Sequence, residues 1–213
     1  DSHKGSFGNA LIVAGSRGMS GAAILAGLGA LRGGAGLTTL AIPQGVQSIV
    51  ASYEPSYLTV GLPEDAAGRI ALAASSEILD RAQTATAVAI GPGWGKSPEL
   101  IELARQLYTQ LEIPLIVDAD ALNALARLPD GIPQTAPAAR ILTPHPGEMA
   151  RLLGVPKEEV VEDPVKAIRM AVEKTHATVL LKGAATLIAS GATPGPPLKF
   201  MLASPEIFTP RFS

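Results

Sequence analysis

The sequence predicts an α/β fold in which a mainly parallel sheet lies between layers of helices. Short β-type runs alternate with segments of helical length along the chain, which is the pattern of strand–helix–strand units with right-handed crossovers. The β-type runs are continuously apolar, as expected for strands that are covered on both faces. Glycine, proline or a chemically active side chain follows five of these runs, at the points where the chain leaves the sheet.

The individual elements follow from these patterns in chain order. The expected strands are short runs rich in Val, Ile, Leu and Ala and cover residues 10–14, 37–42, 57–60, 85–90, 115–117, 140–142, 178–181 and 186–189. The expected helices are longer, beginning with one rich in small residues, and cover residues 21–31, 70–81, 99–111, 121–128, 147–153 and 165–175. Residues 46–53 could form a further short helix. No internal repeat or low-complexity linker interrupts this order.

Composition excludes several classes of protein. Hydrophobic residues make up 47% of the chain and charged residues 17%, which is ample material for a core. A net charge of -2 argues against a surface that binds nucleic acid. The absence of cysteine excludes a disulfide scaffold and fits a reducing compartment. The polar N-terminus is no signal peptide, and no apolar stretch reaches the ~18–20 residues of a membrane span. We therefore expect a cytoplasmic protein without a nucleic-acid or membrane partner.

The five strand ends are the candidate positions for a functional site. In open parallel sheets, ligands bind outside the carboxyl ends of the strands. The ends that carry Gly, Pro or reactive side chains are residues 15–16, 91–93, 118–120, 143–145 and 182–183. We expect all five to lie on one edge of the sheet and to share one site.

A glycine-rich turn, Gly-Pro-Gly-Trp-Gly-Lys-Ser, covers residues 91–97. It is no Walker loop, because three residues separate Gly91 from Gly95 where that loop has four. A turn of this kind that enters a helix offers free N–H groups to an anion. The alternative is an ordinary tight turn between strand and helix. A dinucleotide fingerprint of the Rossmann type is absent.

Two aspartates follow the strand at residues 115–117. A carboxylate at a strand end can hold a magnesium–phosphate group, so Asp118 is a candidate for function as much as for structure. For Asp120 we favour a structural role as the cap of the next helix. Asn123 lies one turn further on and is a third candidate.

A histidine stands between two prolines in Thr-Pro-His-Pro-Gly-Glu, residues 143–148. The prolines fix φ on both sides of His145, so the ring has little freedom, and we favour a ligand contact for it. The alternative is that His145 has no ligand and serves a structural role or lies at the surface. Glu148 falls in the first helical turn, where the helix dipole favours a carboxylate in any case. Lys182, at a later strand end, could meet a nucleotide phosphate or merely cap a surface hairpin.

Taken in order, these motifs resemble the NAD(P)H-hydrate dehydratase family of the ribokinase-like superfamily. The resemblance covers residue 2 to about residue 190 and is most specific at Thr-Pro-His-Pro-Gly-Glu. It rests on Ser-His-Lys-Gly-Ser-Phe-Gly-Asn (2–9), Val-Ala-Gly-Ser (13–16), Met-Ser-Gly-Ala (19–22), Arg-Gly-Gly-Ala-Gly-Leu (32–37), Gly-Pro-Gly-Trp-Gly (91–95), Asp-Ala-Asp-Ala-Leu-Asn (118–123), Thr-Pro-His-Pro-Gly-Glu (143–148) and Leu-Lys-Gly (181–183).

The resemblance implies a ribokinase-like three-layer α/β/α sandwich, a cytoplasmic homo-oligomer (a tetramer) and a repair reaction. The family transfers a phosphoryl group from ADP or ATP, with Mg²⁺, to the C6 hydroxyl of hydrated NADH or NADPH (NADHX or NADPHX, the 6S epimer). Loss of phosphate then restores the dinucleotide. The implied contacts with the hydrated dinucleotide are Ala22, Gly95 and His145. The implied contacts with the adenine nucleotide are Lys182, Gly183, Ala184, Ala185 and Thr186. Further candidates are Gly93, Asp118, Asp120 and Asn123.

One departure from the family pattern concerns catalysis. The family has a Gly-[Thr/Ser]-Gly-Asp motif whose aspartate is the base, whereas the last aspartate of this sequence is Asp163. No catalytic residue and no metal ligand is therefore assigned, and the chain is expected to be inactive as it stands. We expect an incomplete dehydratase domain over residues 1–189, also clipped at its start, and an atypical tail over residues 190–213.

Two other functions remain open from the sequence. One is another ribokinase-like kinase of a small alcohol, such as a thiazole or hydroxymethylpyrimidine kinase, which Thr-Pro-His-Pro-Gly-Glu fits less well. The other is a nucleotide-binding remnant without catalysis, which the absent base supports.

Overall fold

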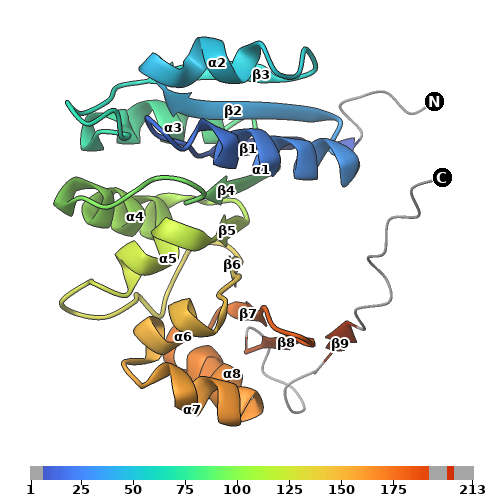
Figure 1. The fold of residues 1–213 in the computed structure, drawn as a ribbon, viewed down its shortest axis with the longest axis vertical. Helices are drawn as coiled ribbons and strands as arrows, with labels where there is room; N and C mark the ends of the chain where they lie inside the picture. Colours follow the sequence, from blue (N-terminus) through green and yellow to red (C-terminus); the bar gives the residue numbers. More distant parts are fainter. Residues whose placement is uncertain (1–6, 192–200, 204–213) are drawn as a thin grey trace.

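The computed structural model describes residues 7–191 and the backbone of residues 201–203. Their strands form one sheet in the order β3-β2-β1-β4-β5-β6-β7-β8-β9, which Figure 1 shows running through the length of the molecule. Strands β1 to β7 pair in parallel and β8 and β9 are added antiparallel. The strands are β1 Asn9–Val13, β2 Leu37–Pro43, β3 Leu58–Leu62, β4 Ala87–Ile90, β5 Leu115–Val117, β6 Arg140–Leu142, β7 Thr178–Leu181, β8 Thr186–Ser190 and β9 Met201–Ala203.

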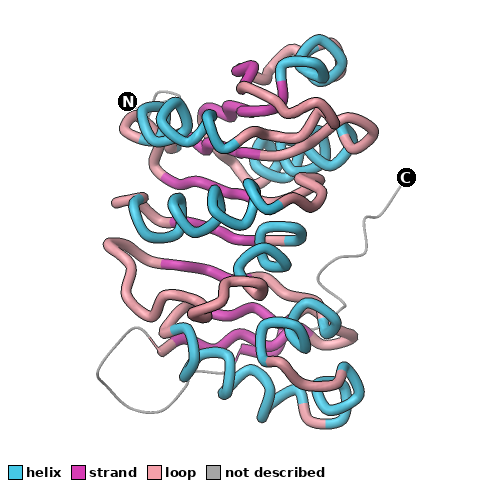
Figure 2. Tube along the Cα trace, turned by 90° about the vertical axis from the view of Figure 1, so that its left-hand side faces the viewer, coloured by secondary structure: helices cyan, strands magenta, loops and turns pink. Residues whose placement is uncertain are grey.

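Helices lie on both sides of the strands, as Figure 2 shows, so the prediction of a three-layer α/β/α fold is confirmed. The α-helices are α1 Ser20–Arg32, α2 Gln47–Ala51, α3 Ser75–Ala82, α4 Pro98–Gln110, α5 Ala119–Leu125, α6 Pro146–Leu153, α7 Lys157–Glu162 and α8 Pro164–Thr175. Short 3-10 turns precede α2 (Gln44–Val46) and α3 (Leu72–Ala74). No helix within the described residues is both long enough and apolar enough to cross a membrane.

Two apolar clusters hold the layers together. Neighbouring residues of β1 belong to different clusters, because successive side chains of a strand point to opposite faces. Leu11 belongs to the cluster that includes side chains of α3 to α8, and Ile12 belongs to the cluster that includes side chains of α1 and α2. Strand β1 is therefore buried on both faces, as its continuous apolar run predicts.

The strands from β5 to β8 are covered less evenly than the sequence predicts. Their side chains alternate between buried and half-buried. The half-buried side chains Ile116, Ile141, Leu180 and Ile188 are part of neither apolar cluster. Within the described residues, one face of this half of the sheet therefore stays partly open to solvent.

Three local elements differ from those expected. The predicted helix over residues 70–81 is broken, because Ile70 pairs with Glu64 in a β-bridge and the α-helix starts only at Ser75. Helix α7 was not predicted, although Pro156 precedes it and two glutamates occupy its first turn. Strand β9 was also not predicted. It is the described part of the expected tail beyond residue 191, the remainder of which lies outside the described residues, as does most of the opening motif.

Among the described residues, a buried arginine lies at the start of β6, on the edge of the sheet formed by the amino ends of the parallel strands. The Arg140 side chain is 4% exposed and has no carboxylate partner among the described residues. Its guanidinium donates to the main-chain carbonyl oxygens of Tyr108, Leu111, Ile113, Ala138 and Ala139. Burial lowers the pKa of Arg140 and raises the pKa of Tyr108, whose ring lies 5.4 Å from the guanidinium carbon, to about 12. Arg140 thereby ties the end of α4 to the sheet.

Candidate active site

The five predicted strand ends lie on one edge of the sheet and are joined by hydrogen bonds. The end of β1 contacts the end of β4, because the Gly15 N–H donates to the Pro92 carbonyl (2.7 Å). Beside it the Ser16 hydroxyl donates to the Gly93 carbonyl (2.8 Å) and is itself buried. The rule that parallel strands bring their carboxyl ends together therefore predicts this edge correctly.

The glycine-rich turn after β4 lies directly against the start of α1. A Cβ added at Gly93 would stand 2.7 Å from the Cβ of Ala22, closer than real carbon atoms approach. Gly93 has a positive φ of 69°, which also favours glycine. Two of the candidate residues, Ala22 and Gly93, are therefore in contact across β1 and β4.

Asp120 joins the same turn from the end of β5. Its Oδ2 accepts a hydrogen bond from the Gly95 N–H at 2.9 Å, although the two residues are 25 positions apart. The prediction that Asp120 caps the following helix is wrong. Asp118 is the residue at the N-cap of α5, and Asp120 falls in its first turn. The helix begins at Ala119, two residues earlier than expected, so the cap position moves from Asp120 to Asp118.

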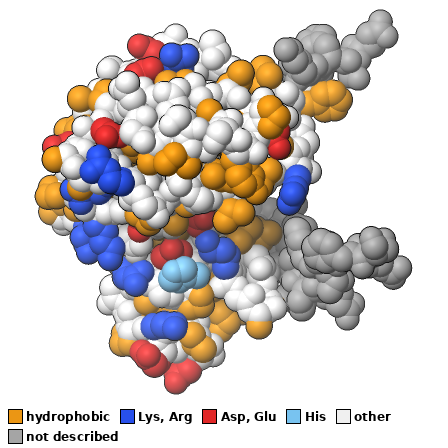
Figure 3. Space-filling view, turned by 45° about the horizontal axis from the view of Figure 1, so that its top comes forward, with side chains coloured by type: hydrophobic (Ala, Val, Ile, Leu, Met, Phe, Trp, Pro, Cys, Tyr) orange, Lys and Arg blue, Asp and Glu red, His pale blue; other side chains and the backbone are white. Residues whose placement is uncertain are grey.

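Asn123 lies on the next turn of α5, beside a shallow hollow. The hollow is lined by Gly95, Lys96, Ser97, Leu100, Ile101, Asp120, Asn123, Ala124 and Arg127. The Asn123 Oδ1 accepts a hydrogen bond from the Arg151 guanidinium at 2.9 Å, which links α5 to α6. Lys and Arg side chains also gather, with acidic ones among them, across the middle of the face that Figure 3 shows. Gly95, Asp120 and Asn123 are thus brought together, and the cations beside them are Lys96, Arg127 and Arg151.

Lys182 connects the other end of this edge. Its Nζ donates to Asp118 Oδ1 at 2.6 Å, across the intervening strand β6. Its main-chain N–H donates to the carbonyl of Pro144, at the end of β6 (2.8 Å). The candidate residues Gly183, Ala184 and Ala185 form the exposed turn between β7 and β8, and Thr186 begins β8.

His145 serves as the N-cap of α6. Its Nδ1 accepts hydrogen bonds from the N–H groups of Gly147 (3.0 Å) and Glu148 (3.2 Å). The buried Glu148 carboxylate accepts the His145 main-chain N–H at 2.9 Å and lies 3.2 Å from the ring Nε2. The pair therefore forms a capping box, which the sequence analysis missed even though the spacing of three residues was visible. Both ring nitrogens are engaged within their own helix, so the ring face and its carbon edge are what His145 presents to solvent.

Replacing His145 with alanine should lower the melting temperature by a few degrees. The variant loses the acceptor for two helix N–H groups, and the loss of an N-cap costs about 1 kcal/mol, or roughly 2–4 °C for a domain of this size. Thermal denaturation checks this, with His145→Asn as the matched control, because asparagine also caps helices. An unchanged melting temperature for His145→Ala would contradict the capping role.

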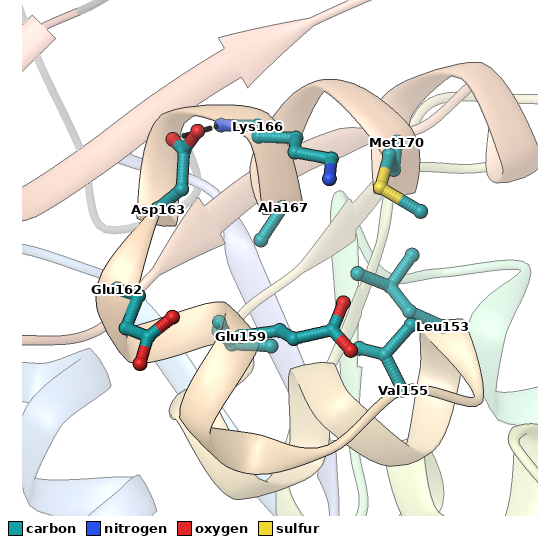
Figure 4. A pocket seen from close by; sticks show the side chains of 9 residues that line it. Leu153, Val155, Glu159, Glu162, Asp163, Lys166, Ala167 and Met170 are labelled. Carbon is teal, nitrogen blue, oxygen red and sulfur yellow. Dashed lines mark hydrogen bonds between the residues drawn. The ribbon is translucent and has the colours of Figure 1, made fainter.

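A second hollow lies away from this edge, between α6, α7 and α8. Figure 4 shows the carboxylates of Glu159 and Glu162 and the Lys166 side chain around it, with Met170 on its apolar side. Asp163 accepts a hydrogen bond from the Lys166 N–H and so caps α8. None of the residues that line this second hollow was predicted as functional, and the hollow is separate from the strand ends of the candidate active site.

The chain is similar to proteins of one family over most of its length. The family model described as NAD(P)H-hydrate dehydratase matches residues 10–197. The bifunctional NAD(P)H-hydrate repair enzyme of Moorella thermoacetica is 43% identical over 190 residues, which are 88% of this chain and 35% of that protein. The Escherichia coli enzyme of the same description is 35% identical over 189 residues, 89% of this chain and 33% of that protein. This chain thus spans about a third of the length of the curated relatives it matches.

Solved structures agree with this similarity. The ADP/ATP-dependent NAD(P)H-hydrate dehydratase of Bacillus subtilis, co-crystallised with ATP and Mg²⁺, superimposes with a TM-score of 0.73 at 30% identity, over 90% of this chain and 64% of that one. A ribokinase-like protein of Enterococcus faecalis, 23% identical, superimposes with a TM-score of 0.71 over 88% of this chain and 62% of that one, which shows the fold alone. The chain has a ribokinase-like fold and belongs to the NAD(P)H-hydrate dehydratase family.

Proposed function

We propose that this chain supplies the binding edge of a nicotinamide-nucleotide repair enzyme, the ADP- or ATP-dependent dehydratase that acts on NADHX and NADPHX. The observation that carries this proposal is the hydrogen-bonded edge of the sheet, where Gly95, Asp120, Asp118 and Lys182 meet in a member of that family. In the proposed reaction the C6 hydroxyl receives a phosphoryl group from the adenine nucleotide. Departure of phosphate and of a ring proton then restores the double bond.

The two substrates are assigned to the two ends of this edge. We infer that the hydrated dinucleotide lies where the glycine-rich turn meets the start of α4, beside a hollow whose lining includes Lys96 and Arg127. The residues assigned to it are Ala22, Gly93, Gly95, Asn123 and His145. The adenine nucleotide is assigned to the exposed turn that begins with Lys182, where an ammonium group and main-chain N–H groups suit phosphates. Because both of its ring nitrogens are engaged, His145 would touch its ligand through the ring.

Magnesium is inferred as a companion of the nucleotide. Within the described residues, no group of three or more His, Asp or Glu side chains could hold a metal ion. Mg²⁺ is commonly bound by one or two carboxylates together with substrate phosphates and water. Asp118 and Asp120 are two such carboxylates at the right edge, so they fit an ion that arrives with the nucleotide and neutralises phosphate charge there.

Binding and turnover are tested separately. Purified 213-residue chain should bind ADP or ATP and hydrated NADPH, measured by calorimetry, and Lys182→Met should weaken nucleotide binding alone. Lys157→Met, on α7, is the matched control. His145→Ala and His145→Asn should both weaken binding of the hydrated dinucleotide. Failure of the unmodified chain to bind either substrate would contradict the proposal.

No residue of this chain is proposed as the base, since the family aspartate has no counterpart in the sequence. With ADP or ATP and Mg²⁺ present, absorbance of the reduced nicotinamide should therefore not recover at the rate of a relative that carries the motif. Recovery at that rate would show that the base lies elsewhere, with Asp118 and Asp120 the first candidates to mutate.

Binding without turnover is also what a nucleotide-binding remnant would show. A thiazole or hydroxymethylpyrimidine kinase would instead prefer its own alcohol to hydrated NADPH.

The assembly is also a proposal. We infer a cytoplasmic homo-oligomer, with one dehydratase domain over residues 1–189. Four exposed apolar side chains support association of copies. They lie on α1, on α2 and the turn after it, and on the edge strand β3, and they are Leu25, Ile49, Tyr53 and Leu58. Light scattering on the purified chain would distinguish a tetramer from a monomer.

A further inference from the structure

Lys182 is already paired with an internal anion. Its Nζ lies 2.6 Å from Asp118 Oδ1, and the two residues are 64 positions apart in the sequence. Both side chains are partly exposed, Lys182 to 41% and Asp118 to 34%. The pair therefore lies at the surface of the edge, where a dissolved anion can reach the ammonium group.

The main chain on both sides of the pair is held firmly. The Asp118 N–H donates to the Ile90 carbonyl (3.1 Å), and the Asp118 carbonyl accepts the Ala121 N–H (3.2 Å). The Lys182 N–H donates to the Pro144 carbonyl (2.8 Å). Both residues are thus held by their main chains, and an exchange of partners requires only rotation of the long, partly exposed Lys182 side chain.

The other charged groups nearby are engaged elsewhere. Asp120 accepts the Gly95 N–H, and Glu148 is used in the capping box with His145. In the part of the chain that the structure describes, neither Asp118 nor Lys182 forms a second ion pair. The pair is therefore a simple exchange site with one cation and one anion.

We propose that Asp118 is an internal competitor that occupies Lys182 until a nucleotide polyphosphate displaces it. The proposal rests on the nucleotide-binding role proposed above for Lys182. A carboxylate at this distance lowers the affinity for every anion, but a di- or triphosphate carries enough charge to win the exchange and inorganic phosphate does not. Asp118 is thereby a specificity-determining residue that makes the edge respond to nucleotide di- and triphosphates.

The experiment compares four proteins in buffer with EDTA, so that no metal takes part. These are the unmodified chain, Asp118→Asn, Lys182→Met and the double variant, and their ADP affinity is measured by calorimetry. Asp118→Asn should bind ADP roughly threefold to tenfold more tightly, because it lacks both the ion pair and the repulsion. Lys182→Met should bind roughly tenfold or more weakly. In the Lys182→Met background, Asp118→Asn should have a much smaller effect, since the competition needs the lysine.

Two controls separate this mechanism from others. Asp130→Asn removes the same charge from a distant exposed loop and should leave ADP affinity unchanged. Inorganic phosphate should gain measurable affinity only in Asp118→Asn. Equal or weaker ADP binding by Asp118→Asn, with a normal melting curve, would overturn the competition while leaving the nucleotide proposal in place. Absence of ADP binding in all four proteins would instead contradict the proposed function on which it rests.

Discussion

The Gly91→Ala variant should be destabilised by about 4 kcal/mol or more, an exceptional loss for one methyl group. An added Cβ would lie 2.0 Å from the Asp118 carbonyl oxygen, 2.6 Å from the Ala121 Cβ and 2.8 Å from the Ala121 nitrogen. Two of these three atoms belong to the main chain at the junction of β5 and α5, which hydrogen bonds hold in place. Gly91 also has a φ of 115°, where an alanine is strained by about 1–3 kcal/mol.

Thermal denaturation should show a fall in melting temperature of roughly 10 °C or more. The matched control is Gly131→Ala, since Gly131 has a positive φ of 77° but no atom within 4 Å of the added Cβ. It isolates the backbone strain, about 1–2 kcal/mol. If both variants melt alike, the close approach of the β4 turn to Asp118 is not as tight as the structure has it, and the site is looser than described.

The location of the site was predictable because it depends on topology and not on side-chain detail. Once alternating strands and helices imply a parallel sheet, the ends of β1, β4, β5, β6 and β7 must share an edge. The glycine-rich turn and Thr-Pro-His-Pro-Gly-Glu are local sequence signals, so they were assigned to that edge without knowledge of their partners.

The partners were not predictable, because they come from distant parts of the chain. The choice of Asp120 as a helix cap was the best local interpretation, yet its carboxylate serves Gly95, 25 residues away. Asp118 was weighed as a metal–phosphate ligand, but the sequence did not reveal its ion pair with Lys182, 64 residues away. A sequence shows which polar groups stand at strand ends, but the pairing depends on the order of strands in the sheet. Two local signals were overlooked, namely the His145–Glu148 capping box and the proline and glutamates that begin α7.

The Arg140→Met variant should lose about 3–5 kcal/mol of stability, although Arg140 lies far from the candidate active site. Methionine fills a similar volume but leaves five carbonyl oxygens without their shared donor, among them those of Tyr108 and Leu111 at the end of α4. The Ala139 carbonyl keeps the Leu115 N–H as a partner, but a buried carbonyl that is left without any donor costs about 1–3 kcal/mol. Arg140→Lys should lose less, because the ammonium keeps some of these bonds without the planar fork that reaches them all.

Arg105→Met is the matched control for this effect, because it makes the same replacement on α4 at a position whose side chain is 47% exposed. Arg105 pairs with Glu102 on the same helix, and an exposed pair of this kind contributes little. Urea denaturation of the three variants should therefore rank Arg140→Met as least stable, Arg140→Lys next and Arg105→Met close to the unmodified chain. A small loss for Arg140→Met would mean that water reaches those carbonyls once the guanidinium is gone. The junction of α4 and β6 would then be held by apolar packing alone.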